Sequence, residues 1–303
     1  MHSKHKKERA PTAARGFLKG RSPTRWAVPL LVGLFAVSGI TAAGALDDSQ
    51  QQIVALTVNG EANTLFKAYP HKLYRRNAED GGWAQVPLPP AIEAHRIAAV
   101  AAAKRKDVLY LAGAGVGVLR SADGGRTWET RNDGLPSREA MALTVHADQP
   151  DTVYVYLAGK GIFRSDDAGK HWKLMDGGPR ERLVQFVHSN MPGSMQTGWF
   201  FAAAANGVAR SMDCFCGWYD AGGLNAEVYA VAYDPKQPQQ VYAATEKGFF
   251  VSTNGGEEWR RVKSPGRIVT ALAVMPSGTL YAASNGRLFR SANGANTWER
   301  IDA

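Results

Sequence analysis

The chain has 303 residues and a formal net charge of +9. The positive charge suggests nucleic-acid binding, but its distribution excludes a basic domain. Residues 1–25 hold eight Lys or Arg and one Glu, whereas residues 47–303 have a net charge of only +2. We therefore predict a basic N-terminal tail and no nucleic-acid partner.

Residues 26–46 follow this tail and carry no charge over 21 positions, "WAVPLLVGLFAVSGITAAGAL". About 20 apolar residues span a bilayer as a helix, and positive charge before the span keeps the N-terminus cytoplasmic. The segment is therefore a transmembrane anchor in the lipid bilayer, or a signal peptide cleaved at Ala43-Gly44-Ala45. We expect an inner-membrane protein with a cytoplasmic tail at 1–25, the anchor or signal segment at 26–46 and a periplasmic domain at 47–303.

One motif recurs through the rest of the chain, with Ser, Asp or Asn, Gly and Trp at relative positions 1, 3, 5 and 8. Asp or Asn followed by Gly between apolar runs is a strong hairpin signal, and the Asp or Asn oxygen can accept backbone hydrogen bonds in its own loop. We predict structural roles for its residues, which are Ser121, Asp123, Gly125, Trp128, Ser165, Asp167, Gly169, Trp172, Asp213, Trp218, Asn254, Gly256, Trp259, Asn293 and Trp298.

A weak sixth copy ends at Trp83, and successive motif tryptophans lie 39 to 46 residues apart. That period, with four strands in each repeat, is typical of a β-propeller. The third repeat shows the four strands at 139–146, 152–158, 161–165 and 172–175. The sequence thus predicts an all-β fold, a six-bladed β-propeller of four-stranded antiparallel blades preceded by the N-terminal membrane or signal segment. We expect each blade to contain consecutive strands, with none exchanged between the first and last blades.

The motif resembles the Asp-box (BNR) repeat, S-x-D-x-G-x-x-W. Such repeats occur in sialidases, in sortilin-type receptors and in the photosystem II stability and assembly factor family. The resemblance covers residues 52–303. The family's assembly-factor propeller has seven blades, whereas this sequence predicts six. The resemblance implies that the hairpins lie on the outer rim and are structural.

The only cysteines, Cys214 and Cys216, stand in "MDCFCGW", where Phe215 replaces the Gly of the motif. An exported protein can form a disulfide, and one here would close the hairpin that lacks its Gly. A redox role or a metal site is the alternative. Structural zinc usually needs four ligands, and no His stands near this pair in the sequence. We predict a disulfide, no metal and no cofactor.

Arginines precede the predicted inner strands of four blades, at Arg96, Arg138, Arg180, Arg182 and Arg267. They could form a basic rim around the propeller axis that binds carboxylates or an acidic protein surface. Alternatively, each is a solvated charge at a strand end, paired with Glu93, Glu139 or Glu181.

Three functions compete. The first is a non-catalytic scaffold that binds a membrane protein complex or its assembly intermediate. The second is a sialidase-like glycosidase, for which Tyr229 with Glu227 or Glu139 could be assembled. The Arg-Ile-Pro signature of sialidases is absent, however, and the connecting loops are too short to suggest a sugar pocket. The third is a permanent accessory subunit of an envelope complex. The sequence favours the first.

Overall fold

The structure is a computed structural model, and it describes residues 52–77, 81–196 and 198–301. The chain divides into two compact units, Met1–Gly44 and Ala45–Ala303, and the description here concerns the second. The predicted tail at 1–25 and the predicted membrane or signal segment at 26–46 lie outside the described residues. Within the described ranges, no helix is long and apolar enough to cross a membrane.

The described residues form an all-β propeller whose strands follow one another in chain order. Blades 1 to 3 contain β1 (Ala55–Asn59), β2 (Thr64–Tyr69), β3 (Lys72–Asn77), β4 (Ala84–Val86), β5 (Ala99–Ala102), β6 (Leu109–Gly113), β7 (Gly117–Ser121), β8 (Glu129–Thr130), β9 (Ala140–Val145), β10 (Val153–Leu157), β11 (Gly161–Ser165) and β12 (Lys173–Asp176). Blades 4 to 6 contain β13 (Leu183–Ser189), β14 (Trp199–Ala204), β15 (Gly207–Met212), β16 (Tyr219–Asp220), β17 (Val228–Asp234), β18 (Gln237–Thr245), β19 (Gly248–Ser252), β20 (Arg260–Val262), β21 (Val269–Val274), β22 (Leu280–Ser284), β23 (Arg287–Ser291) and β24 (Glu299–Arg300).

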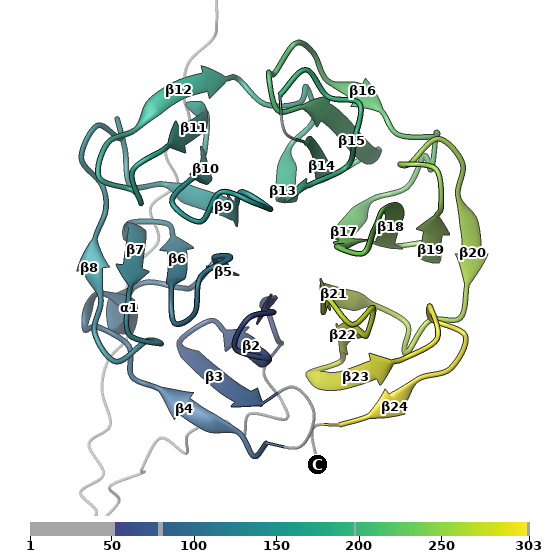
Figure 1. Cartoon of the computed structure of the whole chain (residues 1–303), viewed down its shortest axis with the longest axis horizontal. Coiled ribbons are helices and arrows are strands. Elements are labelled where there is room, and N and C mark those ends of the chain that lie inside the picture. Colours follow the sequence, from purple (N-terminus) through teal and green to yellow (C-terminus); the bar gives the residue numbers. More distant parts are fainter. Residues whose placement is uncertain (1–51, 78–80, 197, 302–303) are drawn as a thin grey trace, which may run out of the picture. The chain divides into compact units, whose positions relative to one another are not determined.

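This topology confirms the predicted architecture of six four-stranded antiparallel blades (Figure 1). Each blade is a meander whose first strand faces the axis and whose fourth strand lies on the circumference (Figure 1). β24 pairs with β23 of its own blade, so among the described residues no strand is exchanged between the last and first blades. The short helix α1 (Ala91–Ala94), in the connection from β4 to β5, was not predicted; its Ile92 is buried.

The apolar core lies between neighbouring blades rather than at the axis. In the described residues, each of the six seams between blades holds one cluster of buried side chains. Alternate residues of a strand enter different seams: Val153 and Val155 pack against blade 2, and Tyr154 packs against blade 4. Because both faces of a blade are buried, the second strands are continuous apolar runs instead of alternating ones.

Side-chain hydrogen bonds to the backbone join adjacent inner strands across these seams. The Thr57 hydroxyl accepts from the Ala102 N–H at 3.0 Å, and the Gln185 Oε1 accepts from the Val231 N–H at 2.8 Å. At the seam that closes the ring, the Thr270 hydroxyl donates to the Ile53 carbonyl at 2.7 Å. Within the part of the chain that the structure describes, the ring is therefore closed by packing and side-chain bonds and not by an exchanged strand.

Candidate functional site

A cavity of about 560 Å³ lies on the axis of the propeller. All six inner strands contribute the residues near their C-terminal ends, and the turns that follow these strands form its rim. We call this side of the propeller the hairpin face, because the Ser–Trp hairpins between third and fourth strands also lie there. The opposite side, the arginine face, is formed by the loops that lead into the inner strands.

One part of the cavity wall is polar. Blade 3 contributes Thr144 and His146, blade 4 contributes Gln185 and His188, and blade 5 contributes Tyr233. The corresponding positions of blades 1, 2 and 6 are mostly apolar. Burial lowers the pKa of His146 to about 4 and also lowers the pKa of His188, so both rings are neutral near pH 7.

His146 and His188 of this wall form a buried cluster with Asp213. Each offers one ligand atom within 4.8 Å of the others, a grouping that could hold a metal ion. His188 Nε2 lies 3.8 Å from Asp213 Oδ2, and these two side chains are 0% and 1% exposed. The sequence analysis missed the cluster because its members come from the turn after β9, from β13 and from the hairpin after β15, so nothing in their spacing along the chain connects them.

The hydrogen bonds of the two rings argue against a metal at this cluster. His146 Nδ1 accepts from the backbone N–H groups of Asp148 and Gln149, both at 3.0 Å. His188 Nδ1 accepts from the Ala147 N–H at 3.1 Å. A neutral ring that accepts at Nδ1 carries its proton on Nε2. Metal-binding histidines have the opposite arrangement, with a bare ligating nitrogen and a second nitrogen that donates. The cluster is thus better described as two Nε2–H groups beside one carboxylate.

The five arginines named from the sequence all lie on the arginine face. Arg96 precedes β5, Arg138 precedes β9, Arg180 and Arg182 precede β13, and Arg267 precedes β21. All five are exposed. Among the described residues none has an ion pair, so the predicted pairing with Glu93, Glu139 or Glu181 is not made. None of the five lines the axial cavity.

A second hollow of about 550 Å³ on the arginine face adjoins one of these residues. Arg180 and Glu181 line it together with Tyr219, whose side chain is 56% exposed. The face therefore combines unpaired cations with an exposed aromatic ring, a composition typical of protein-binding surfaces.

Four of the recurring hairpins share one hydrogen-bond pattern. In blade 2, Ser121 Oγ donates to Asp123 Oδ1 at 2.8 Å and accepts from the Gly125 N–H at 2.8 Å. The Thr127 hydroxyl donates to the Asp123 carboxylate. This hydrogen bond is the largest of the effects that hold the pKa of the Asp123 carboxyl well below its usual range. Blades 3, 5 and 6 repeat the Ser bonds with Asp167, Asn254 and Asn293.

The motif tryptophans connect the hairpins of blades 2, 3, 5 and 6 to the preceding blade by a common bond, whereas the buried Nε1 of Trp83 in blade 1 has no hydrogen-bond partner among the described residues. In each of these four, the indole Nε1–H donates to the backbone carbonyl of the residue that follows the fourth strand of the preceding blade. The donor–acceptor pairs are Trp128 with Pro87, Trp172 with Arg131, Trp259 with Ala221 and Trp298 with Lys263. These four donor–acceptor distances lie between 2.6 and 2.9 Å. Trp83 and Ile301 both pack against the cluster of buried side chains where blade 6 meets blade 1. The tryptophan spacing of the sequence therefore reflects seams between blades.

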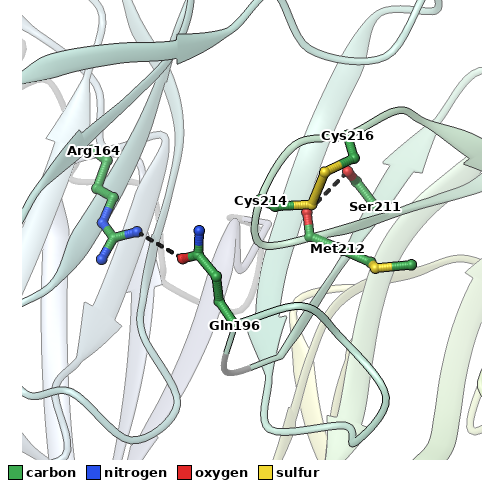
Figure 2. Close-up of a disulfide and its surroundings, with 6 residues drawn as sticks. All are labelled: Arg164, Gln196, Ser211, Met212, Cys214 and Cys216. Atoms are coloured by element: carbon green, nitrogen blue, oxygen red, sulfur yellow. Dashed lines mark hydrogen bonds between the residues drawn. A yellow bond between two sulfur atoms is a disulfide. The ribbon is translucent and has the colours of Figure 1, made fainter.

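The hairpin of blade 4 departs from this pattern. Ser211 Oγ donates to the Met212 carbonyl at 3.1 Å instead of to a carboxylate (Figure 2). Asp213, predicted to cap its own loop, is directed inward to the histidine cluster. Cys214 and Cys216 form a disulfide across the turn (Figure 2). Trp218 donates to the Asp176 carboxylate at 2.7 Å rather than to a backbone carbonyl.

Comparison with protein-family models finds no match, and comparison with curated proteins finds none. Among solved structures, the chain is similar to the GH74 enzyme of Niastella koreensis, with 15% identity and a TM-score of 0.59 over 83% of this chain and 48% of that one. This chain thus spans about half the length of that enzyme.

Two further structures of propellers are similar over nearly their whole length. YCF48 bound to a D1 peptide is 16% identical, with a TM-score of 0.56 over 84% of this chain and 83% of that one. YCF48 from Cyanidioschyzon merolae is 15% identical, with a TM-score of 0.53 over 84% and 86%. At these identities the likeness shows the propeller fold alone.

Proposed function

We propose that this chain is a non-catalytic, membrane-tethered periplasmic propeller that binds protein, as a scaffold in the assembly or stabilisation of a membrane protein complex. The observation that carries the proposal is the arginine face, where five exposed arginines at the mouths of four inner strands lack an ion pair among the described residues. Such cations recruit an acidic surface or peptide, increasing the rate of encounter and fixing its register.

The similarity to YCF48 supports the same function. That propeller is known in a structure bound to a D1 peptide, and the match covers 84% of this chain and 83% of that one. The tether rests on the sequence of residues 26–46, which lie outside the described residues, and on the Asp-box resemblance to exported assembly factors.

A glycoside hydrolase is the second candidate, because a GH74 enzyme has the same fold. Most glycosidases need two carboxyl groups facing the scissile bond, one of them as acid. The axial cavity offers Glu61 and Asp148, but Asp148 is engaged with Lys104 Nζ at 2.8 Å. This engagement disfavours an acid–base pair there.

The test is recovery of partners by the full-length chain from gently solubilised membranes, at low and moderate salt. Arg138→Glu with Arg182→Glu should abolish recovery of acidic membrane partners.

The matched control is Lys106→Glu with Lys236→Glu, which changes the net charge equally. Lys106 and Lys236 are exposed, lie on the hairpin face and have no ion pair among the described residues. Equal recovery by both double variants would contradict the basic-rim proposal. Turnover of a polysaccharide or sialoside by the wild type would favour the hydrolase.

A further inference from the structure

The disulfide of blade 4 joins Cys214 and Cys216 and encloses a single residue, Phe215. In the chain-entropy account, a disulfide stabilises a protein by closing a loop of the unfolded chain, and the gain is smallest for the shortest loop. A disulfide that closes a loop around one residue therefore contributes little to the stability of the fold. The blade is already held by packing in the seams on both sides of it.

Other contacts hold the turn in shape without the sulfur–sulfur bond. The Asp213 N–H donates to the Gly198 carbonyl at 3.1 Å, and the Phe215 N–H donates to the Met212 carbonyl at 2.9 Å. The Phe215 ring stacks on Phe200 with 4.9 Å between centroids. The two Cα atoms are 5.4 Å apart. These contacts would keep both thiols together after reduction, a condition for a bond that opens and closes reversibly.

The two cysteines differ in exposure to solvent. Cys216 is exposed, whereas Cys214 is half-buried beside Asp213, which is buried. In thiol–disulfide exchange an incoming thiolate attacks the accessible sulfur, and the other sulfur leaves as a thiolate. Because Cys216 is the more exposed residue, its sulfur is the one we expect an incoming thiolate to attack, an asymmetry that a purely structural bond would not need.

We propose that Cys214–Cys216 is a thiol–disulfide exchange site for a dithiol of a protein substrate. A substrate thiolate attacks Cys216 Sγ, forming a mixed disulfide and releasing Cys214 as a thiolate, which takes up a proton. The second substrate thiolate then attacks the substrate sulfur of the mixed disulfide and releases Cys216. One substrate dithiol is oxidised to a disulfide, and one Cys214–Cys216 disulfide is reduced to two thiols.

The first experiment uses the full-length chain and a peptide that contains two cysteine thiols. After an acid quench and alkylation, mass spectrometry should find one peptide disulfide for each chain reduced, while the near-ultraviolet circular dichroism of the fold persists. The proposal would be overturned if the peptide reduced the Cys214–Cys216 bond only after denaturant had unfolded the chain, because the disulfide would then be inaccessible in the folded protein.

A matched pair of variants tests which sulfur reacts. Cys214→Ser leaves the exposed Cys216, and Cys216→Ser leaves the half-buried Cys214. With oxidised glutathione as probe, Cys216 should form a mixed disulfide at least about tenfold faster than Cys214. Equal rates would contradict the assigned roles. If either variant fails to fold, the mixed disulfide trapped from the wild type and mapped by peptide mass decides the same question, with Cys216 expected to carry the substrate.

Discussion

The hairpins of blades 3 and 4 occupy equivalent places in adjacent blades, yet they are held together by different chemistry. In blade 3, Ser165 and Asp167 bond to each other and to the backbone of their own loop. In blade 4, Ser211 bonds to the adjacent carbonyl, Asp213 is directed inward, and a disulfide crosses the turn. The Trp at position 8 donates to the preceding blade in both.

The difference shows which part of the motif builds the propeller. In blade 4 the tryptophan bond to the preceding blade persists although the Ser–Asp network is lost, so we infer that the tryptophan contributes more than the loop network to the seam between blades 3 and 4. The loop network is replaceable, and in blade 4 the freed carboxylate lies instead beside the two cavity-lining histidines. The variants below test this division of roles.

The largest effect is expected at Trp172, which is buried in the seam between blades 2 and 3. Trp172→Ala should lower the free energy of unfolding by about 3–5 kcal/mol, because it empties a large aromatic site. Trp172→Phe isolates the bond from Nε1 to the Arg131 carbonyl, which is worth about 1 kcal/mol. Denaturant titration gives both values, and a loss below about 1 kcal/mol for the alanine variant would show that the seam does not depend on this ring.

Acid should weaken the contact between the inner strands of blades 3 and 4, where His146 and His188 lie, before it affects the hairpin of blade 3. Burial lowers the pKa of His146 to about 4 and also lowers the pKa of His188 in the folded chain. As the pH falls below about 6.5, these histidines are therefore protonated in the unfolded chain while they are still neutral in the folded chain. Stability is therefore full above pH 6.5 and decreases toward pH 4, by on the order of 2–3 kcal/mol for His146. Asp148 and Asp213 oppose the shift of His146, whereas Arg164 reinforces it.

Unfolding midpoints measured between pH 4.5 and 7.5 would test this dependence. The control is His146→Asn, whose side-chain oxygen can accept the N–H groups of Asp148 and Gln149 but does not titrate. It should flatten the profile. An equally steep profile in the variant would assign the acid sensitivity to other groups.

The same substitution at position 3 should have different costs in the two blades. Asp167→Asn should be nearly neutral, because Asn254 and Asn293 already make the equivalent bonds in blades 5 and 6. Asp213→Asn should cost about 1–3 kcal/mol, because it sets an amide N–H₂ among the buried Nε2–H groups. Thermal unfolding of the two variants side by side measures the contrast, and equal costs would mean that Asp213 caps its loop after all.

The repeat period and strand pattern were sufficient to predict the six blades, their consecutive strands and the closure of the ring. The reason is that a propeller is made of units that follow one another in sequence, so local patterns carry the architecture. The helix α1 was missed, since four residues after Pro89-Pro90 give no helical periodicity. The cluster of His146, His188 and Asp213 was missed for the opposite reason. It forms only when the ends of two inner strands about 40 residues apart meet the hairpin that follows β15.

The smallest effects on stability are expected on the arginine face, where blades 3 and 4 are alike. Arg138 precedes the inner strand of blade 3 and Arg182 that of blade 4; both are exposed and have no ion pair among the described residues. Arg138→Glu and Arg182→Glu, made singly, should each change the free energy of unfolding by at most about 1 kcal/mol.

If both arginines contact one acidic partner, each substitution should also lower the association rate, and the decrease should be larger at low salt than at high salt, because exposed charges act mainly on the rate of encounter. Stopped-flow or surface-binding kinetics with the purified partner would compare them. A defect confined to Arg182→Glu would place recognition beside the disulfide-bearing blade alone, and the difference between the two hairpins would then extend to the opposite face.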